Sequence, residues 1–324
     1  MRLRHRRSFL RLAAGAAAFP SLSRVASADN YPTRPVHIIV AFPAGNASDT
    51  IARLAAQGLS ERLGQSFVIE NRPGAGGQIG VELVVRAPPD GYTLLVASAV
   101  NAVNATLYGK LNYNFMRDIA PVASICRVPD VMVVNPSVPA KTVPEFIAYA
   151  KANPGKINMA SAGNGSASHL AGELFKMMTG VDLVHVPYRG SFIPDLLGGQ
   201  VQVTFAPIPV AIAYIRAGKL RVLAVTGAAR SKALPDTPTV AEFVPGYEAS
   251  AWYGIGAPEK TPAEIIDRLN KEITACLADP KVNARLSDLG AIPMAMTPEE
   301  FGKFIAAETE KWAKVIRAAN IKPE

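Results

Sequence analysis

Cysteine is scarce in this chain, whose 324 residues include only Cys126 and Cys276. The only pairing they allow is a single disulfide, which an oxidising compartment would permit. Cys126 lies in an apolar, strand-like stretch, and Cys276 lies in an amphipathic helical pattern. We therefore expect two buried free thiols, with the disulfide as the alternative.

Long apolar runs and common catalytic motifs are also missing. After residue 28 no apolar run reaches the roughly 18 residues of a membrane span, which predicts a soluble mature protein. The chain has no P-loop, H-E-x-x-H, C-x-x-C or G-x-S-x-G motif. His169 and His185 lack the spacing of metal ligands. The Gly-rich stretch 72–80 misses the dinucleotide-binding spacing, so we predict no metal, no cofactor and no catalytic residue.

The first 28 residues have the features of a signal peptide. Their start is basic and free of acids, the Ala-rich stretch 9–19 is apolar, and Ala26-Ser27-Ala28 is typical of a cleavage site. We expect cleavage near Ala28 and a mature protein in the periplasm. The stretch 6–11, Arg-Arg-Ser-Phe-Leu-Arg, resembles a twin-arginine signal. The general secretory route is the alternative.

Basic charge is concentrated in this segment, which holds six arginines and no acid. Without it, the formal net charge falls from +8 to +2. The basic balance therefore belongs to the signal and does not indicate nucleic-acid binding. We predict no nucleic-acid partner.

The remaining residues alternate short β-rich runs with amphipathic helical stretches, which predicts an α/β protein with largely parallel sheets. Thr-Pro-x-Glu boxes predict helix starts at 261–264 and 297–300. Two stretches, 125–134 and 246–258, lead from one α/β block to another and back, so the helices after 262 should pack against the first block. The predicted domains are 29–128 with 250–324, and 129–249, joined as a hinged molecule with a cleft. The expected strands are 37–42, 67–70, 92–97, 131–134, 156–160, 182–187, 202–206, 220–226 and 251–257, and the expected helices are 48–63, 77–87, 143–152, 166–179, 192–197, 209–217, 262–278, 280–289 and 298–319.

Two strand-to-helix loops, 41–49 and 160–169, are suited to receive an anion. Each combines small residues, which let a ligand approach the backbone, with a polar residue that can cap the following helix. In the first loop this residue is Ser48 or Asp49, and in the second it is Ser166. The free N–H groups and the dipole of such a helix end favour a carboxylate or phosphate. Ordinary tight turns with helix caps are the alternative for each loop. The pair, with one loop per block, could close on one ligand from both sides.

At these loops the chain resembles the Bug family, the extracytoplasmic solute receptors of tripartite tricarboxylate transporters. The resemblance runs from Tyr31 to Trp312 and rests on eight ordered motifs. Their matched stretches are 42–53, 70–80, 89–95, 161–170, 185–190, 196–200, 218–224 and 238–242.

The resemblance implies a two-lobed, type II-like periplasmic binding protein that closes over a small carboxylated solute, either an organic acid or an acidic amino acid. It implies delivery of that solute to transporter subunits in the membrane, and we expect the receptor to be a monomer. Asn46 occupies a position where the family usually has a second glycine, which leaves the ligand's identity open. The ligand-binding residues carried over are Phe42, Ala44, Gly45, Asn46, Asp49, Ser98, Asn101, Gly163, Ser166, Tyr188 and Gly190.

Three other functions compete with solute capture for transport. A sensor receptor that signals to a membrane kinase would share the same cleft. A secreted hydrolase using Ser166 and a histidine would need an oriented nucleophile, base and acid, and no such trio is recognisable. The effector domain of a cytoplasmic regulator is disfavoured by the signal peptide and by the absence of a helix-turn-helix.

Overall fold

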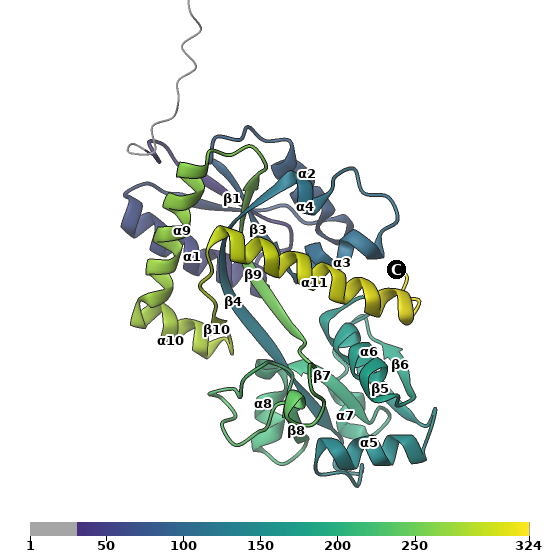
Figure 1. Ribbon diagram of the computed structural model, residues 1–324. Coiled ribbons are helices and arrows are strands. Elements are labelled where there is room, and N and C mark those ends of the chain that lie inside the picture. The colour runs from purple at the N-terminus through teal and green to yellow at the C-terminus, as the bar shows by residue number, and fades with distance from the viewer. Residues whose placement is uncertain (1–30, 324) are drawn as a thin grey trace, which may run out of the picture.

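The computed structural model describes residues 31–323, so the predicted signal peptide lies outside the described residues. Figure 1 shows two α/β lobes joined by long strands. The first lobe contains β1 (Val36–Val40), α1 (Ala47–Leu63), β2 (Phe67–Asn71), α2 (Gln78–Val85), β3 (Thr93–Ser98), α3 (Ala99–Leu107), α4 (Phe115–Asp118), α9 (Ala263–Ala278), α10 (Pro280–Asp288), β10 (Ile292–Pro293) and the start of α11 (Pro298–Ala318). The second lobe contains α5 (Val143–Ala152), β5 (Ile157–Ser161), α6 (Ala167–Thr179), β6 (Leu183–Pro187), α7 (Ile193–Gly198), β7 (Val203–Pro207), α8 (Ile208–Arg216) and β8 (Arg221–Val225).

Two antiparallel strands connect the lobes, β4 (Ile119–Val134) and β9 (Ser250–Pro258). They pair along the length of β9, and β4 then continues into the second lobe, where it pairs with β7 and β8. The path through the sheet is β2-β1-β3-β9-β4-β7-β5-β6, with β8 and β10 attached to β4. The predicted crossing 125–134 lies within β4, and the predicted crossing 246–258 includes all of β9. The strand predicted at 131–134 is the end of the much longer β4.

Strand alternation explains how the first sheet is covered on both faces. Val36, Ile38 and Val40 belong to the apolar cluster that includes α1 and α9 residues. Ile39 lies between them in sequence and packs on the other face, in the cluster that includes Phe301 of α11. Parallel strands buried on both faces form near-continuous apolar runs, as β1 does. The α/β prediction is confirmed, but the expectation of largely parallel sheets is wrong. Among the described residues four strand pairs are parallel and five are antiparallel, because the connecting strands β4 and β9 run antiparallel to their neighbours.

Helix α3 was not predicted, because its sequence, Ala-Val-Asn-Ala-Val-Asn-Ala-Thr-Leu, has weak helix propensity and no clear apolar period. A local capping contact and two tertiary contacts supply what propensity lacks. The Asn101 side chain accepts from the backbone N–H of Ser98, and Asn104 donates to the carbonyl of Gly76. Val103 packs with residues of the second lobe.

Of the two predicted capping boxes, the one at Thr297 and Glu300 is confirmed. The box at Thr261 and Glu264 is wrong. Thr261 instead donates its hydroxyl to the carbonyl of Pro258, so it closes the turn after β9 and leaves α9 to begin without a side-chain cap.

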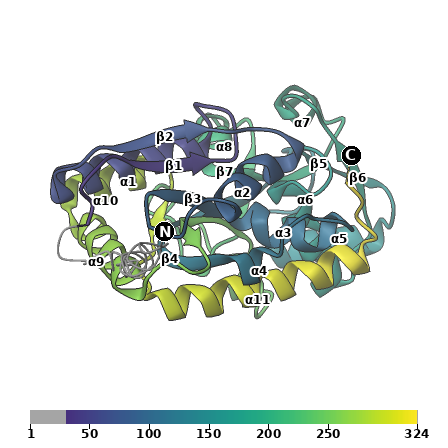
Figure 2. The ribbon, with the colours of Figure 1, turned by 90° about the horizontal axis from the view of Figure 1, so that it is seen from above.

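The expectation that the helices after 262 pack against the first lobe alone is wrong for α11. Figure 2 shows α11 running along one side of the molecule, past α4 and α3 toward the second lobe. Its first half packs through Phe301 in the first lobe, whereas Trp312, Val315 and Ile316 belong to the core of the second. The 21-residue helix therefore braces both lobes.

Cys126 and Cys276 are both free and buried, as expected. Within residues 31–323 no helix combines the length and the apolar character needed to cross a bilayer.

Candidate functional site

The helices α1, α3 and α6 begin at one cavity between the lobes. Its volume is about 260 Å³. The first lobe contributes residues from the loop before α1 and from the start of α3, the second lobe contributes the start of α6, and β9 closes the back. The lining residues are Phe42, Asn46, Ala47, Ser48, Ser98, Ala99, Val100, Ala167, Ala251, Trp252 and Tyr253.

Hydrogen bonds from Asn46 and Asp49 fix the loop before α1. Asn46 accepts from the Asp49 N–H at 2.9 Å and caps the helix. The expectation that Ser48 or Asp49 caps this helix is wrong, because α1 begins at Ala47 and the cap position therefore falls on Asn46. The Asp49 carboxylate accepts from the Gly45 N–H and from Arg53 and Asn71, all at 2.9 Å. The hydrogen bond from Arg53 is the largest cause that lowers the pKa of Asp49 to about 2. Asp49 is therefore an ionised, buried anchor of the loop.

The predicted residues of this loop occupy two kinds of position. Phe42 and Asn46 line the cavity. Asp49 is buried behind it, and Ala44 and Gly45 are exposed and absent from the lining. At the next helix Ser98 lines the cavity, whereas buried Asn101 uses its side-chain oxygen to accept from the Ser98 N–H at 2.8 Å.

The loop before α6 is held by a set of short-range hydrogen bonds. The Ser166 hydroxyl donates to the Gly163 carbonyl at 2.7 Å and accepts from the His169 N–H at 3.3 Å. His169 Nδ1 accepts from the Gly165 N–H at 3.1 Å. Gly163 has a φ of +110° and Gly165 a φ of +72°, both in the region that favours glycine. These hydrogen bonds fix the loop so that the first residue of α6, Ala167, lines the cavity.

Gly165 also lies close to the first lobe. A Cβ atom at Gly165 would lie 2.9 Å from Cδ2 of Leu107, the last residue of α3. Neither Gly163 nor Ser166 lines the cavity, but their neighbours Gly165 and Ala167 line the space between the lobes. The sequence analysis missed Ala167, the small residue that directly follows the capping residue Ser166.

A stacked pair of histidines, the buried His169 and the half-buried His185, lies next to this loop. The rings of His169 and His185 stack with their centroids 3.6 Å apart, and the Ser161 hydroxyl and His185 Nε2 are 2.6 Å apart. Desolvation by burial is the main cause that lowers the pKa of His169 to about 3 and also lowers the pKa of His185, so both rings are neutral. Ser161 is fully buried, which leaves this serine–histidine contact closed to a substrate.

Tyr188 and Gly190 do not line the cavity. The Tyr188 hydroxyl donates to Asp195 at 2.7 Å, and its ring packs against Phe192. Gly190 is exposed. The structure therefore does not bring these two residues together with the others.

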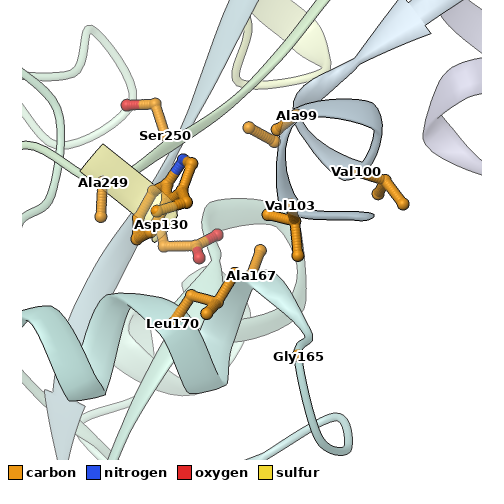
Figure 3. Close-up of a pocket in the computed structure, with 11 residues that line it drawn as sticks. Ala99, Val100, Val103, Asp130, Gly165, Ala167, Leu170, Ala249 and Ser250 are labelled. Atoms are coloured by element: carbon orange, nitrogen blue, oxygen red, sulfur yellow. The ribbon is translucent and has the colours of Figure 1, made fainter. Parts of the chain in front are cut away.

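A narrow recess of about 40 Å³ extends the cavity between the lobes, and Figure 3 shows its walls. Cavity and recess share Ala99, Val100, Ala167 and Ala251. Most of the recess wall is apolar, but Asp130 of β4 points its carboxyl into it, toward the start of α6 (Figure 3). The sequence contained a signal for this residue, an acid inside the apolar stretch 128–134.

Among the described residues, no group of three or more His, Cys, Asp or Glu side chains is placed to hold a metal ion. No Lys or Arg lines the cavity or the recess. What the site offers is helix N-termini, a few neutral side chains and one buried carboxyl.

Two lobes joined by long strands, with helix N-termini from both lobes at one cavity, define a bilobed solute-binding protein. The model of the tripartite tricarboxylate transporter family receptor, TctC, matches residues 51–321. The chain therefore belongs to this family of receptors, and the resemblance stated from the motifs is confirmed.

Individual relatives agree along nearly the whole chain. Protein BugT of Bordetella pertussis is 40% identical over 301 residues, which cover 91% of this chain and 92% of BugT. The structure of R. palustris Rpa4515 with adipate superimposes with a TM-score of 0.75 at 39% identity, covering 91% of this chain and all of that one. MatC of Rhodopseudomonas palustris with bound malate gives a TM-score of 0.71 at 33% identity, and the match covers 88% of this chain and 100% of that one. The two-lobed fold is thereby confirmed.

Proposed function

We propose that this protein captures a small carboxylated solute between its lobes and delivers it to the membrane subunits of a tripartite tricarboxylate-type transporter. The observation that carries the proposal is the convergence of the α1, α3 and α6 N-termini on one cavity that no basic side chain lines. Free N–H groups and helix dipoles attract an anion without a fixed counter-charge. Two relatives were solved with adipate and with malate, which are both carboxylates.

The cavity wall also contains an unused donor. The Trp252 indole N–H is buried and has no hydrogen-bond partner among the described residues. A buried donor without a partner costs about 1–3 kcal/mol. A ligand oxygen, or a water held by the ligand, would satisfy it and favour the bound state.

The predicted site residues are assigned two roles in this proposal. Phe42, Asn46 and Ser98 contact the ligand. Asp49, Asn101, Gly163 and Ser166 hold the helix ends in place through the hydrogen bonds and backbone geometry described above. Ala44, Gly45, Tyr188 and Gly190 lie outside the wall in this conformation, and a role for them requires further closure of the lobes.

The proposal includes export by the segment 1–28, action in the periplasm as a monomer, and binding without chemical turnover. Burial of Ser161 and the commitment of Ser166 to its own loop support the absence of a serine nucleophile. A sensor role would use the same cleft and differs only in the membrane partner.

A charge change at a helix cap tests the anion site. Asn46→Asp keeps a side chain that caps α1, because Asp and Asn are equally good caps, but places a negative charge beside the cavity. We expect a mature protein, unfolded and refolded to remove bound solute, to be stabilised by its carboxylate ligand and not by the uncharged amide. Asn46→Asp should weaken that binding at least about tenfold, which corresponds to roughly 1.4 kcal/mol.

Asn114→Asp is the matched control, because Asn114 caps α4 away from the cavity. The readout is the shift of thermal unfolding, where a ligand at about 100 times its Kd adds roughly 2.7 kcal/mol of stability. Equal stabilisation by acid and amide, or equal effects of the two variants, would contradict the helix-end site. Conversion of the bound compound would contradict a receptor role.

A further inference from the structure

The Asp130 carboxyl is buried in the recess without a cationic partner. Its residue is 5% exposed, and within residues 31–323 no Lys, Arg or His lies within ion-pair distance of it. Desolvation by burial raises the pKa of Asp130 to about 7. A buried carboxylate is costly unless a cation or several donors compensate it.

The basic side chains nearest in sequence to the recess residues Asp130 and Trp312 already form ion pairs elsewhere. Arg127, on the same strand, pairs with Glu248. Lys311, next to Trp312 on α11, pairs with Glu308 and donates to the Glu248 carbonyl.

The polar groups around the recess do not serve the carboxyl either. The Trp312 indole N–H donates to Glu308 at 3.0 Å, and the Tyr247 hydroxyl donates to the Ala171 carbonyl at 3.0 Å. Thr226 exchanges hydrogen bonds with the backbone of Asp130 and not with its carboxyl. In Figure 3 the Ser250 hydroxyl points away from Asp130. Any ionic partner of the Asp130 carboxyl therefore comes from the space that the carboxyl faces.

That space adjoins the cavity, since the two share four wall residues, so a single bound solute can extend from one toward the other. The cavity end offers helix N-termini, which favour an anion, and the recess end offers one carboxyl between apolar walls, which favours a cation. Val103, Leu170 and Trp312 would cover the apolar part of a solute between these ends.

We propose that the Asp130 recess is a subsite for an ammonium group, so that the captured solute is an amino acid whose carboxylate lies at the helix ends. This inference rests on the proposed function and specifies the class of solute. Asp130 would bind the ammonium as an ion pair, and it would repel a solute with a second carboxylate at that end.

The test compares acids that share a chain and differ in one group. The probes are the α-amino and ω-amino acids of three to six carbons, with the monocarboxylates and dicarboxylates of equal length. Binding is measured by calorimetry on refolded, ligand-free mature protein at neutral pH. We expect an amino acid to bind at least about tenfold more tightly than both of its matched acids.

Asp130→Asn should abolish this preference, because it keeps the shape of the side chain and removes its charge. Affinity for the amino acid should fall at least about tenfold, and affinity for the matched dicarboxylate should rise. Asp182→Asn is the control, since Asp182 is an exposed acid of the same lobe and lies outside the recess. It should leave all the affinities unchanged.

Each other outcome overturns a defined part of the argument. If a monocarboxylate or dicarboxylate binds as tightly as the amino acid, or if the preference survives in Asp130→Asn, the ammonium subsite is wrong and carboxylate capture stands. The subsite is equally wrong if the series fails while a wider set of carboxylates gives a ligand without an amino group. If no carboxylate of any kind binds, the proposed function itself fails.

Discussion

Replacing Asp130 with Asn should stabilise the ligand-free protein, and the gain should grow with pH. Asp130 is buried in the recess, and burial raises the pKa of Asp130 to about 7. In the unfolded chain an aspartate titrates near about 3.9. Between these values the folded state retains a proton that the unfolded state has released, so the free energy of unfolding falls as pH rises.

The size of the effect follows from the difference between the two pKa values. About three pKa units, at roughly 1.4 kcal/mol each, give an upper limit of about 4 kcal/mol, reached above pH 7. The change between about pH 5 and pH 8 amounts to roughly 2–3 kcal/mol of that total. Tyr247 and Tyr253 interact electrostatically with Asp130, but the pKa of each is raised, so both remain neutral throughout this range.

The assay is denaturant unfolding of the refolded wild type and of Asp130→Asn at several pH values. Asn resembles the protonated carboxyl, so the two proteins should be close in stability at about pH 4 and should diverge toward pH 8. Taking the difference removes the titration of other groups, including His169, whose lowered pKa makes the protein less stable on acidification below about pH 6.5. A stability difference that does not change with pH would refute the reasoning, because it would mean that Asp130 titrates alike in both states.

Two further predictions address the second loop and export. Gly163→Val should reduce affinity for the solute at least about a hundredfold by calorimetry while the circular dichroism spectrum is retained, because a β-branched residue is strained at a φ of +110°. Gly180→Val, with a φ of +70° at the far end of α6, should keep affinity; equal losses would remove the loop from the site. Replacing Arg6 and Arg7 with Lys should stop periplasmic accumulation, measured by cell fractionation, if the twin-arginine route is used. Normal accumulation would instead indicate the general secretory route.

The two loops were predictable because they are local. Each has small residues after a strand and a polar residue before an amphipathic helix, all in consecutive positions. Ser166 caps α6 as expected, whereas α1 is capped by Asn46 and not by Ser48 or Asp49. The α/β class was predictable for the same reason, since strand and helix periods differ within short windows. The motifs added the two-lobed fold, which the family match and the solved relatives confirm.

Features that depend on distant partners were missed or misplaced. Helix α3 gains stability from Asn104 bonding to Gly76 and from packing across the lobes, neither of which is visible in its own sequence. The position of α11 across both lobes depends on Trp312 finding the core of the second lobe. Asp130 stands out in the sequence as an acid in an apolar strand, but its lack of a partner is a property of the folded surroundings.

Sequence alone therefore decided most strands and helices, the two loops and the expectation of an exported receptor, because those depend on neighbouring residues or on ordered motifs. Only the tertiary structure decided which of the predicted residues line the cavity. It placed Phe42, Asn46 and Ser98 at the wall and Asp49 and Asn101 behind it. It also placed the Asp130 recess beside the cavity. The physical reason is that burial and the pairing of charges depend on residues brought together from both lobes, and no single segment contains them.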